Sequence, residues 1–146
     1  MKVLVLFLAS AIYVGANQHH DLATVAHMVV ADADTNHDGA ISVEELKHEL
    51  IAKWDRDANP TDMRVSKHDF LTQWTARYGD FHHDASVFFD KLDTNKDGQL
   101  SESDLLFHIF TLDPDLNGLV TPQEFEAFIM KNHPCGHHGK FGCGTA

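Results

Sequence analysis

A short acidic pattern occurs twice in almost the same form and limits what this chain can fold into. The sequence DTNHDGAISVEE begins at Asp34, and DTNKDGQLSESD begins at Asp93. Each has oxygen-bearing side chains at alternate positions, then a glycine, then a closing acid at position twelve. Two like charges about 4 Å apart repel by roughly 1 kcal/mol in water and about 4 kcal/mol at an effective dielectric near 20. Nothing in the first stretch neutralises its charges, which indicates a bound cation.

The spacing of these oxygens matches what a calcium ion requires. Calcium takes about six to eight hard oxygen ligands at about 2.3–2.6 Å. Loop positions 1, 3 and 5 supply side-chain oxygens, position 7 supplies a backbone carbonyl, position 9 often acts through water, and position 12 supplies a carboxylate. Position 6 turns sharply at positive φ, which glycine adopts at low cost. The pattern therefore predicts calcium-binding loops.

Three segments supply a complete set of candidate metal ligands. In loop one they are Asp34, Asn36, Asp38, Ala40 by its carbonyl, Ser42 and Glu45. In loop three they are Asp93, Asn95, Asp97, Gln99, Ser101 and Asp104. In loop four they are Asp113, Asp115, Asn117, Leu119, Thr121 and Glu124. Loop three ends on an aspartate, one methylene shorter than glutamate, so we expect weaker calcium binding there and consider Mg²⁺ an alternative ion.

A fourth acidic segment, loop two at residues 55–69, is degenerate. It starts with Asp55, Asp57 and Asn59, but Pro60 stands where the glycine belongs. Three additional residues precede its closing acid, Asp69. We interpret loop two as a relic that preserves the fold, with calcium binding as the alternative.

The acidic loops alternate with stretches in which apolar residues recur at helical spacing. Residues 21–34 also correspond to 80–93, so the chain divides into two repeated halves, 17–79 and 80–132, followed by a His/Cys tail at 133–146. We expect an all-α fold. The predicted helices cover residues 20–33, 43–53, 67–78, 81–92, 102–111 and 122–132.

On these motifs, residues 20–132 resemble the EF-hand superfamily, in particular its calmodulin-like type with four loops. The resemblance implies an array of helix–loop–helix units that bind calcium. In that family an exiting and an entering helix separate consecutive loops. Here Asp55 follows Asp34 by 21 residues and Asp113 follows Asp93 by 20. This leaves room for one helix of about ten residues, which is about 15 Å long.

Two loops at opposite ends of one helix cannot lie side by side. We therefore expect pairing between the halves, of loop one with loop three or with loop four. The apolar residues at position 8, where such loops pair by a short β contact, are Ile41, Leu100 and Val120.

The N-terminal sequence is typical of a secretory signal peptide. Lys2 precedes an apolar run at residues 3–13 that only Ser10 interrupts, and Val14 and Ala16 suit a cleavage site. The alternative, a membrane anchor, needs about 20 apolar residues. We predict that residues 1–16 are removed and that the mature chain is extracellular.

The two ends of the mature chain carry further candidate metal sites. A free N-terminus at Asn17-Gln18-His19 would offer Cu²⁺ a square-planar set of nitrogens. Cys135 and Cys143 are the two cysteines, and an oxidising environment favours a disulfide between them. The alternative is zinc held by both cysteines, His133 and a histidine of the 137–138 pair.

Composition narrows the function. Only 11 Lys and Arg residues stand against 22 Asp and Glu residues, which argues against nucleic-acid binding. No nucleophile elbow, HExxH motif or Gly-rich phosphate loop is present, so we expect no enzyme. After signal removal only Met28, Met63 and Met130 remain, too few for the Met-rich groove of a calcium sensor.

We therefore expect a secreted calcium-binding protein that serves as an extracellular calcium buffer, a carrier or a mineral-handling protein. The alternatives are a calcium-stabilised adaptor module of the extracellular matrix and a calcium sensor that binds a protein partner. Either would bind an extracellular protein, and a mineral-handling protein would contact a mineral surface.

Overall fold

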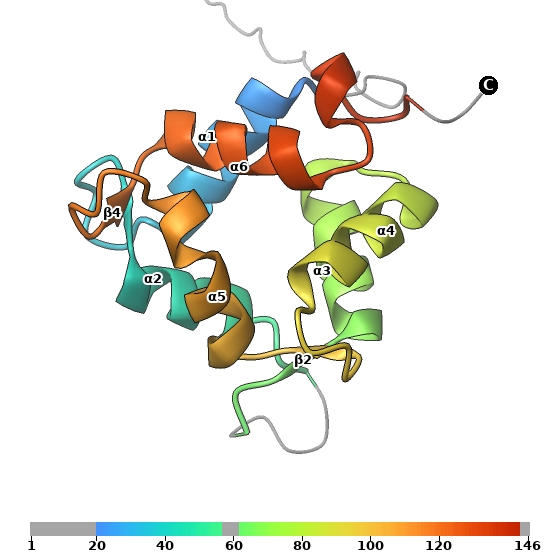
Figure 1. Cartoon of the computed structure of the whole chain (residues 1–146), viewed down its shortest axis with the longest axis horizontal. Helices are drawn as coiled ribbons and strands as arrows, with labels where there is room; N and C mark the ends of the chain where they lie inside the picture. Colours follow the sequence, from blue (N-terminus) through green and yellow to red (C-terminus); the bar gives the residue numbers. More distant parts are fainter. Residues whose placement is uncertain (1–19, 57–61, 144–146) are drawn as a thin grey trace, which may run out of the picture.

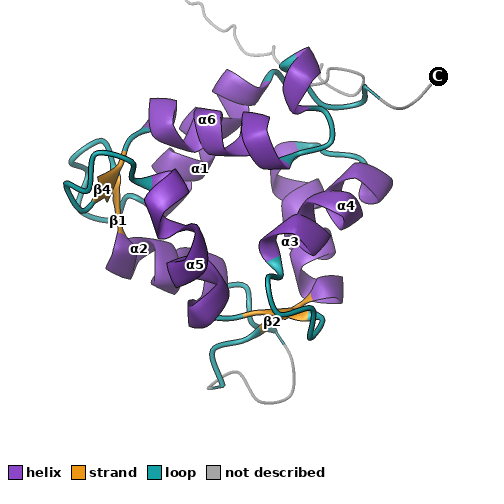
Figure 2. Ribbon diagram, viewed as in Figure 1, coloured by secondary structure: helices purple, strands orange, loops and turns teal. Residues whose placement is uncertain are grey.

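The computed structural model describes residues 20–56 and 62–143, and its secondary structure is mainly helical, with loops and short strands between the helices (Figure 2). The predicted signal peptide, the candidate copper site and part of loop two, residues 57–61, lie outside the described residues. The α-helices of the described part are α1 (Leu22–Ala33), α2 (Val43–Lys47), α3 (Lys67–Tyr78), α4 (His82–Leu92), α5 (Glu102–Leu112) and α6 (Pro122–Asn132).

Two shorter helical elements complete the secondary structure. Helix α2 continues directly into a π-helical segment, η2 (His48–Ala52), and a 3₁₀ turn, η3 (Gly136–His138), lies in the tail. The predicted all-α, helix–loop–helix fold is confirmed, with one continuous helical stretch between loops one and two. Within the described residues, no helix is both long and apolar enough to cross a membrane.

Short antiparallel strands join the four loops in two pairs. Strand β1 (Ile41–Ser42) of loop one pairs with β4 (Leu119–Val120) of loop four. Strand β2 (Val65–Ser66) of loop two pairs with β3 (Gln99–Leu100) of loop three. The loops therefore pair between the halves, as expected. Loops three and four were the two predicted partners of loop one, and the structure pairs it with loop four. Figure 1 shows the two pairs at different sides of the molecule. The division of the chain into domains remains a prediction.

The core consists of the apolar faces of the helices, and aromatic rings fill its centre. Phe70 and Trp74 stack with ring centroids 5.6 Å apart, and Phe88 lies 5.2 Å from Trp74. All three side chains are buried. Offset and tilted ring pairs of this kind contribute about 0.5–1.5 kcal/mol each beyond the area that they bury. The cluster joins α3 to α4.

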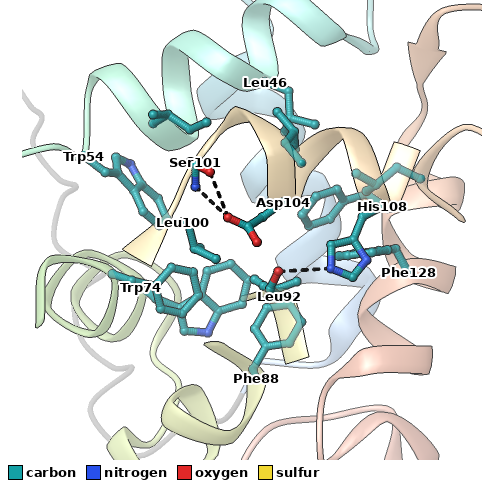
Figure 3. Close-up of a pocket in the computed structure, with 15 residues that line it drawn as sticks. Leu46, Trp54, Trp74, Phe88, Leu92, Leu100, Ser101, Asp104, His108 and Phe128 are labelled. Carbon is teal, nitrogen blue, oxygen red and sulfur yellow. Dashed lines mark hydrogen bonds between the residues drawn. The ribbon is translucent and has the colours of Figure 1, made fainter. Parts of the chain in front are cut away.

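An apolar pocket lies beside this aromatic cluster, and α5 forms one of its walls (Figure 3). Ser101, Asp104 and His108 supply the polar groups among the lining residues. The ring of His108 is 3.2 Å from the carbonyl oxygen of Leu92, and burial lowers the pKa of His108. The pocket thus brings the last residue of loop three into contact with the core.

A buried carboxylate, Asp80, ties the tail to the corner between α3 and α4. Its oxygens accept hydrogen bonds from Trp74 Nε1 at 2.8 Å, from the backbone N–H of Phe81 at 2.7 Å and from His133 Nε2 at 2.8 Å. His133 Nδ1 accepts from the backbone N–H of Cys135 at 3.0 Å, so the ring proton lies on Nε2. The side chains of Asp80 and His133 are both 0% exposed, so the network is shielded from water.

We expect Asp80→Asn to lower the free energy of unfolding by about 2–3 kcal/mol, because hydrogen bonds to a buried charged acceptor contribute that much. Urea unfolding followed by tryptophan fluorescence measures this loss. The matched control is Asp90→Asn, since Asp90 is 57% exposed and pairs with Lys67 at the surface; a surface pair contributes about 0–1 kcal/mol. Equal losses in the two variants would contradict the role assigned to Asp80.

Candidate metal centres

Loop one is shaped by hydrogen bonds from its backbone to its own acidic side chains. Asp34 Oδ2 accepts from the N–H of Gly39 at 2.8 Å, and Asp34 Oδ1 accepts from Asp38 at 3.1 Å. Asn36 Oδ1 also accepts from the N–H of Asp38, at 2.9 Å, and Asp38 Oδ1 accepts from Ala40 at 3.0 Å. These bonds fix the side chains of the candidate ligands at positions 1, 3 and 5 to the backbone of the loop.

Loops three and four repeat the same geometry. Asp93 Oδ2 accepts from Gly98 at 2.8 Å, and Asp113 Oδ2 accepts from Gly118 at 2.8 Å. The φ angles at position 6 are positive in all three loops, a conformation that glycine adopts at low cost. They are 91° at Gly39, 82° at Gly98 and 86° at Gly118. Position 4 is also left-handed, at His37 62°, Lys96 62° and Leu116 58°.

Positions 9 and 12 serve a second purpose at the start of the next helix. Ser42 is the N-cap of α2, and Glu45 Oε2 accepts from the backbone N–H of Ser42 at 2.9 Å. Thr121 and Glu124 form the same capping box at the start of α6, with the corresponding bond at 2.9 Å. The closing acid therefore stabilises the exiting helix as well as the loop.

The residue at position 2 separates loop four from the other two. Thr35 donates its N–H and its hydroxyl to Glu45 Oε1, both at 2.9 Å. Thr94 donates to Asp104 Oδ1 in the same way, at 2.9 and 2.7 Å. Loop four has Pro114 at this position, and proline carries no N–H.

In loop four the closing acid lies with the other acids. Within the described part of the chain, Glu124 accepts side-chain or backbone hydrogen bonds only from Thr121. Asp113, Asp115 and Glu124 each offer an oxygen within 4.8 Å of the others. This separation suits three oxygens on one ion, since ligands at about 2.3–2.6 Å from a metal lie up to about 5 Å apart. Loop four thus has its acidic ligands gathered.

The pKa values of the closing acids in loops one and three reflect the hydrogen bonds that these acids accept. The backbone N–H of Ser42, with further donors from Ser42, Thr35 and Asn36, lowers the pKa of Glu45 to about 2 despite its burial. Burial raises the pKa of Asp104, but the bonds from Thr94 and Ser101 outweigh it, and the net shift is downward.

The acids of loop four interact with one another. The pKa of Asp115 is raised, first by desolvation, and also by its hydrogen bond with Asp113 and by the charge of Glu124. The pKa of Asp113 is lowered, because the N–H groups of Gly118 and other donors outweigh its desolvation. Unrelieved repulsion among close carboxylates is what a bound cation would remove.

Loop three has a competing cation. Arg64, which follows the degenerate start of loop two, places Nη1 3.7 Å from Asp97 Oδ2 and 3.3 Å from Gln99 Oε1. Across residues 20–56 and 62–143, no Lys or Arg forms such an ion pair with the candidate ligands of loops one and four. The charge of Arg64 disfavours a cation in loop three, and the shorter Asp104 disfavours calcium in particular.

Loop two keeps its second half in the form of the others. Asp69 Oδ2 accepts from the hydroxyl of Ser66 at 3.1 Å, and Ser66 caps α3 by accepting from the N–H of Asp69. Together with the β2–β3 pairing, this supports a structural role. Asp57, Asn59 and Pro60 lie outside the described residues, so calcium binding by loop two stays untested.

The tail contains a disulfide between Cys135 and Cys143, as predicted. His133 points to Asp80 at 2.8 Å, so the zinc set named from the sequence is not gathered: both sulfurs are bonded to each other and His133 is engaged elsewhere. Sequence reasoning did not identify the contacts of Arg64 with Asp97 or of Asp80 with His133, because these residues lie far apart in the chain. It also passed over the Thr/Pro difference at position 2, which is visible in the sequence.

Comparison with known proteins agrees with the local geometry. Residues 31–51 and 86–106 each match the family model described as EF hand. These segments contain loops one and three, and loop four lies outside them. No curated protein and no solved structure matches the chain. The chain thus contains two EF-hand motifs, which support calcium binding and belong to a generally non-enzymatic family.

We expect Glu45 to make the chelator-treated chain sensitive to acid. Its pKa in the folded chain is about 2, against 4.5 for an ordinary glutamate. The stability that it contributes is therefore complete above pH 4.5 and is lost as the pH falls through about 2. Urea unfolding should show Glu45→Gln less stable than the natural chain at pH 6, with the difference closing near pH 2.

The matched control is Glu44→Gln, because Glu44 is adjacent in the chain and its side chain is 83% exposed. That variant should differ little from the natural chain at either pH. A Glu45→Gln deficit that stays constant from pH 6 to pH 2 would contradict the hydrogen-bond account.

Proposed function

We propose that this chain binds two or three calcium ions and acts as an extracellular calcium buffer, carrier or mineral-handling protein. The gathered carboxylates of Asp113, Asp115 and Glu124 carry the proposal. Loop one supplies a second site with a full set of ligands. Loop three supplies a weaker third site, which Mg²⁺ could also occupy because Mg²⁺ accepts closer oxygens at about 2.0–2.1 Å.

A buffering role follows from the affinity that such sites have outside cells. Extracellular EF-hand modules bind calcium with dissociation constants of about 10⁻⁴–10⁻³ M. At a free calcium level ten times the dissociation constant, each site adds about 1.4 kcal/mol to stability. Sites in that range stay largely loaded, release ions as the concentration falls, and brace the fold. The formal net charge of −11 attracts further cations.

The pairing of loop one with loop four supports cooperation between two sites. Ile41 lies opposite Val120, and Ser42 lies opposite Leu119. Position 7 of loop four and position 9 of loop one thus belong to the same two-stranded unit. Ordering one loop around an ion restrains the strand that the other loop must also order, so part of the entropic cost of the second binding step is already met.

One observation favours the alternative, an adaptor that binds a protein partner. Leu106, Phe107 and Phe110 on α5 are 47%, 69% and 70% exposed. Exposed apolar groups that lie together are typical of protein interaction sites. Phe107→Ser with Phe110→Ser should leave calcium binding unchanged in either case, and loss of calcium-dependent retention on an extracellular matrix preparation would favour the adaptor.

Isothermal titration calorimetry of the mature chain tests the proposal. We expect two or three calcium equivalents, with Glu45→Gln and Glu124→Gln each removing one, because an amide lacks the charge of the closing carboxylate. Owing to the β1–β4 pairing, each variant should also weaken the site in the paired loop more than the site in loop three.

Glu44→Gln is the control and should retain the full stoichiometry, since Glu44 stands at position 11 and faces solvent. Full stoichiometry in both test variants would refute the ligand assignment. If no calcium is taken up by the natural chain, the proposed function itself is wrong.

A further inference from the structure

A buried carboxylate lies against the disulfide without a donor to satisfy it. Asp84 is 5% exposed, and its Oδ2 lies 3.4 Å from Sγ of Cys135. A sulfur in a disulfide carries no proton, so it cannot donate a hydrogen bond to this oxygen. The described parts of the chain give the Asp84 carboxylate no other hydrogen-bond partner. A buried charge left in this way needs an explanation.

The position of Asp84 in its helix explains the charge only in part. It lies in the first turn of α4, where the helix dipole favours an anion. This accounts for an acid in that turn but not for a carboxylate buried against a sulfur. A group that binds carboxylate and sulfur together would satisfy both atoms.

The three side chains have the chemistry and spacing of a zinc site. Ligand atoms of Asp84, Cys135 and Cys143 all lie within 4.8 Å of one another. Zinc binds cysteine sulfur at about 2.3 Å and carboxylate oxygen at about 2.0–2.2 Å, so tetrahedral angles place sulfur and oxygen about 3.6 Å apart. The Asp84–Cys135 separation of 3.4 Å is close to that value. Once the sulfur–sulfur bond is broken, only the sulfurs need to move apart.

Neighbouring groups hold these ligands in place. The backbone N–H of Cys135 donates to His133 Nδ1, and His133 in turn donates to the buried Asp80. The N–H of Cys143 points at Sγ of Cys135 from 3.1 Å, which would stabilise a thiolate there. His133 is therefore a positioning residue rather than a ligand, as is common around metal sites.

We propose that the reduced chain binds one zinc ion through Cys135, Cys143 and Asp84, with water in the fourth position, and that the zinc ion and the disulfide exclude each other. A dithiol reductant supplies two electrons and two protons to break the sulfur–sulfur bond and is itself oxidised to a disulfide. Zinc then displaces the two thiol protons. Soft thiolate ligands select zinc over calcium, so this site is independent of the acidic loops.

Cobalt(II) is the probe, because thiolate ligands give it a charge-transfer absorption that oxygen ligands do not. The full mature chain is reduced with a dithiol, desalted without oxygen and saturated with calcium. We expect one equivalent of Co²⁺ to produce the absorption and one equivalent of Zn²⁺ to abolish it. The oxidised chain should produce none. Absence of the absorption from the reduced chain at stoichiometric Co²⁺ would overturn the proposal.

Variants separate this folded site from a flexible pair of thiols. Asp84→Asn should weaken binding about tenfold or more, whereas Asp90→Asn, on the exposed face of the same helix, should leave it unchanged. Asp84→Cys should increase the charge-transfer intensity in proportion to its third thiolate. This gain of signal does not depend on the stability of the asparagine variant. Unchanged affinity in Asp84→Asn, or unchanged intensity in Asp84→Cys, would show that Asp84 is not a ligand.

Discussion

The arrangement of the molecule depends on one constraint: consecutive loops share a single short helix. Helices α2 and η2 together connect loop one to loop two, and α5 alone connects loop three to loop four. A helix of about ten residues is about 15 Å long, so the loops at its two ends point away from each other. Each loop must find its β partner in the other half, and the pairs β1–β4 and β2–β3 result. The two halves are thereby interlocked at two places.

A second principle is that the same side chains shape the loops and begin the helices. Glu45 closes loop one and completes the capping box of α2 with Ser42. Glu124 does the same with Thr121 at α6. A metal ion that drew on these carboxylates would act on atoms that already hold the first turn of a helix. Ion binding and helix stability are therefore coupled through one functional group, in keeping with the general coupling of metal binding to folding.

A few substitutions give the four loops different local structures. Thr35 and Thr94 engage the closing acids of loops one and three, whereas Pro114 leaves Glu124 to lie with Asp113 and Asp115. Loop two has Pro60 in place of the glycine and three additional residues, but it keeps a helix cap and a strand, and its Arg64 reaches into loop three. The degenerate repeat thus stabilises the fold and opposes a cation in its partner. The paired loops one and four have in common that, within the described residues, no Lys or Arg forms an ion pair with their candidate ligands.

The sequence by itself determined the six helices, the loop geometry, the disulfide and the rule that pairing must cross the halves. Each of these depends on the period of apolar residues, on glycine at a left-handed position, or on a spacing along the chain. Tertiary structure alone decided that loop one pairs with loop four, that Arg64 meets Asp97, that His133 turns to Asp80, and that Asp84 lies against Cys135. These contacts join residues distant in the chain, and the packing of whole helices sets which side chains meet.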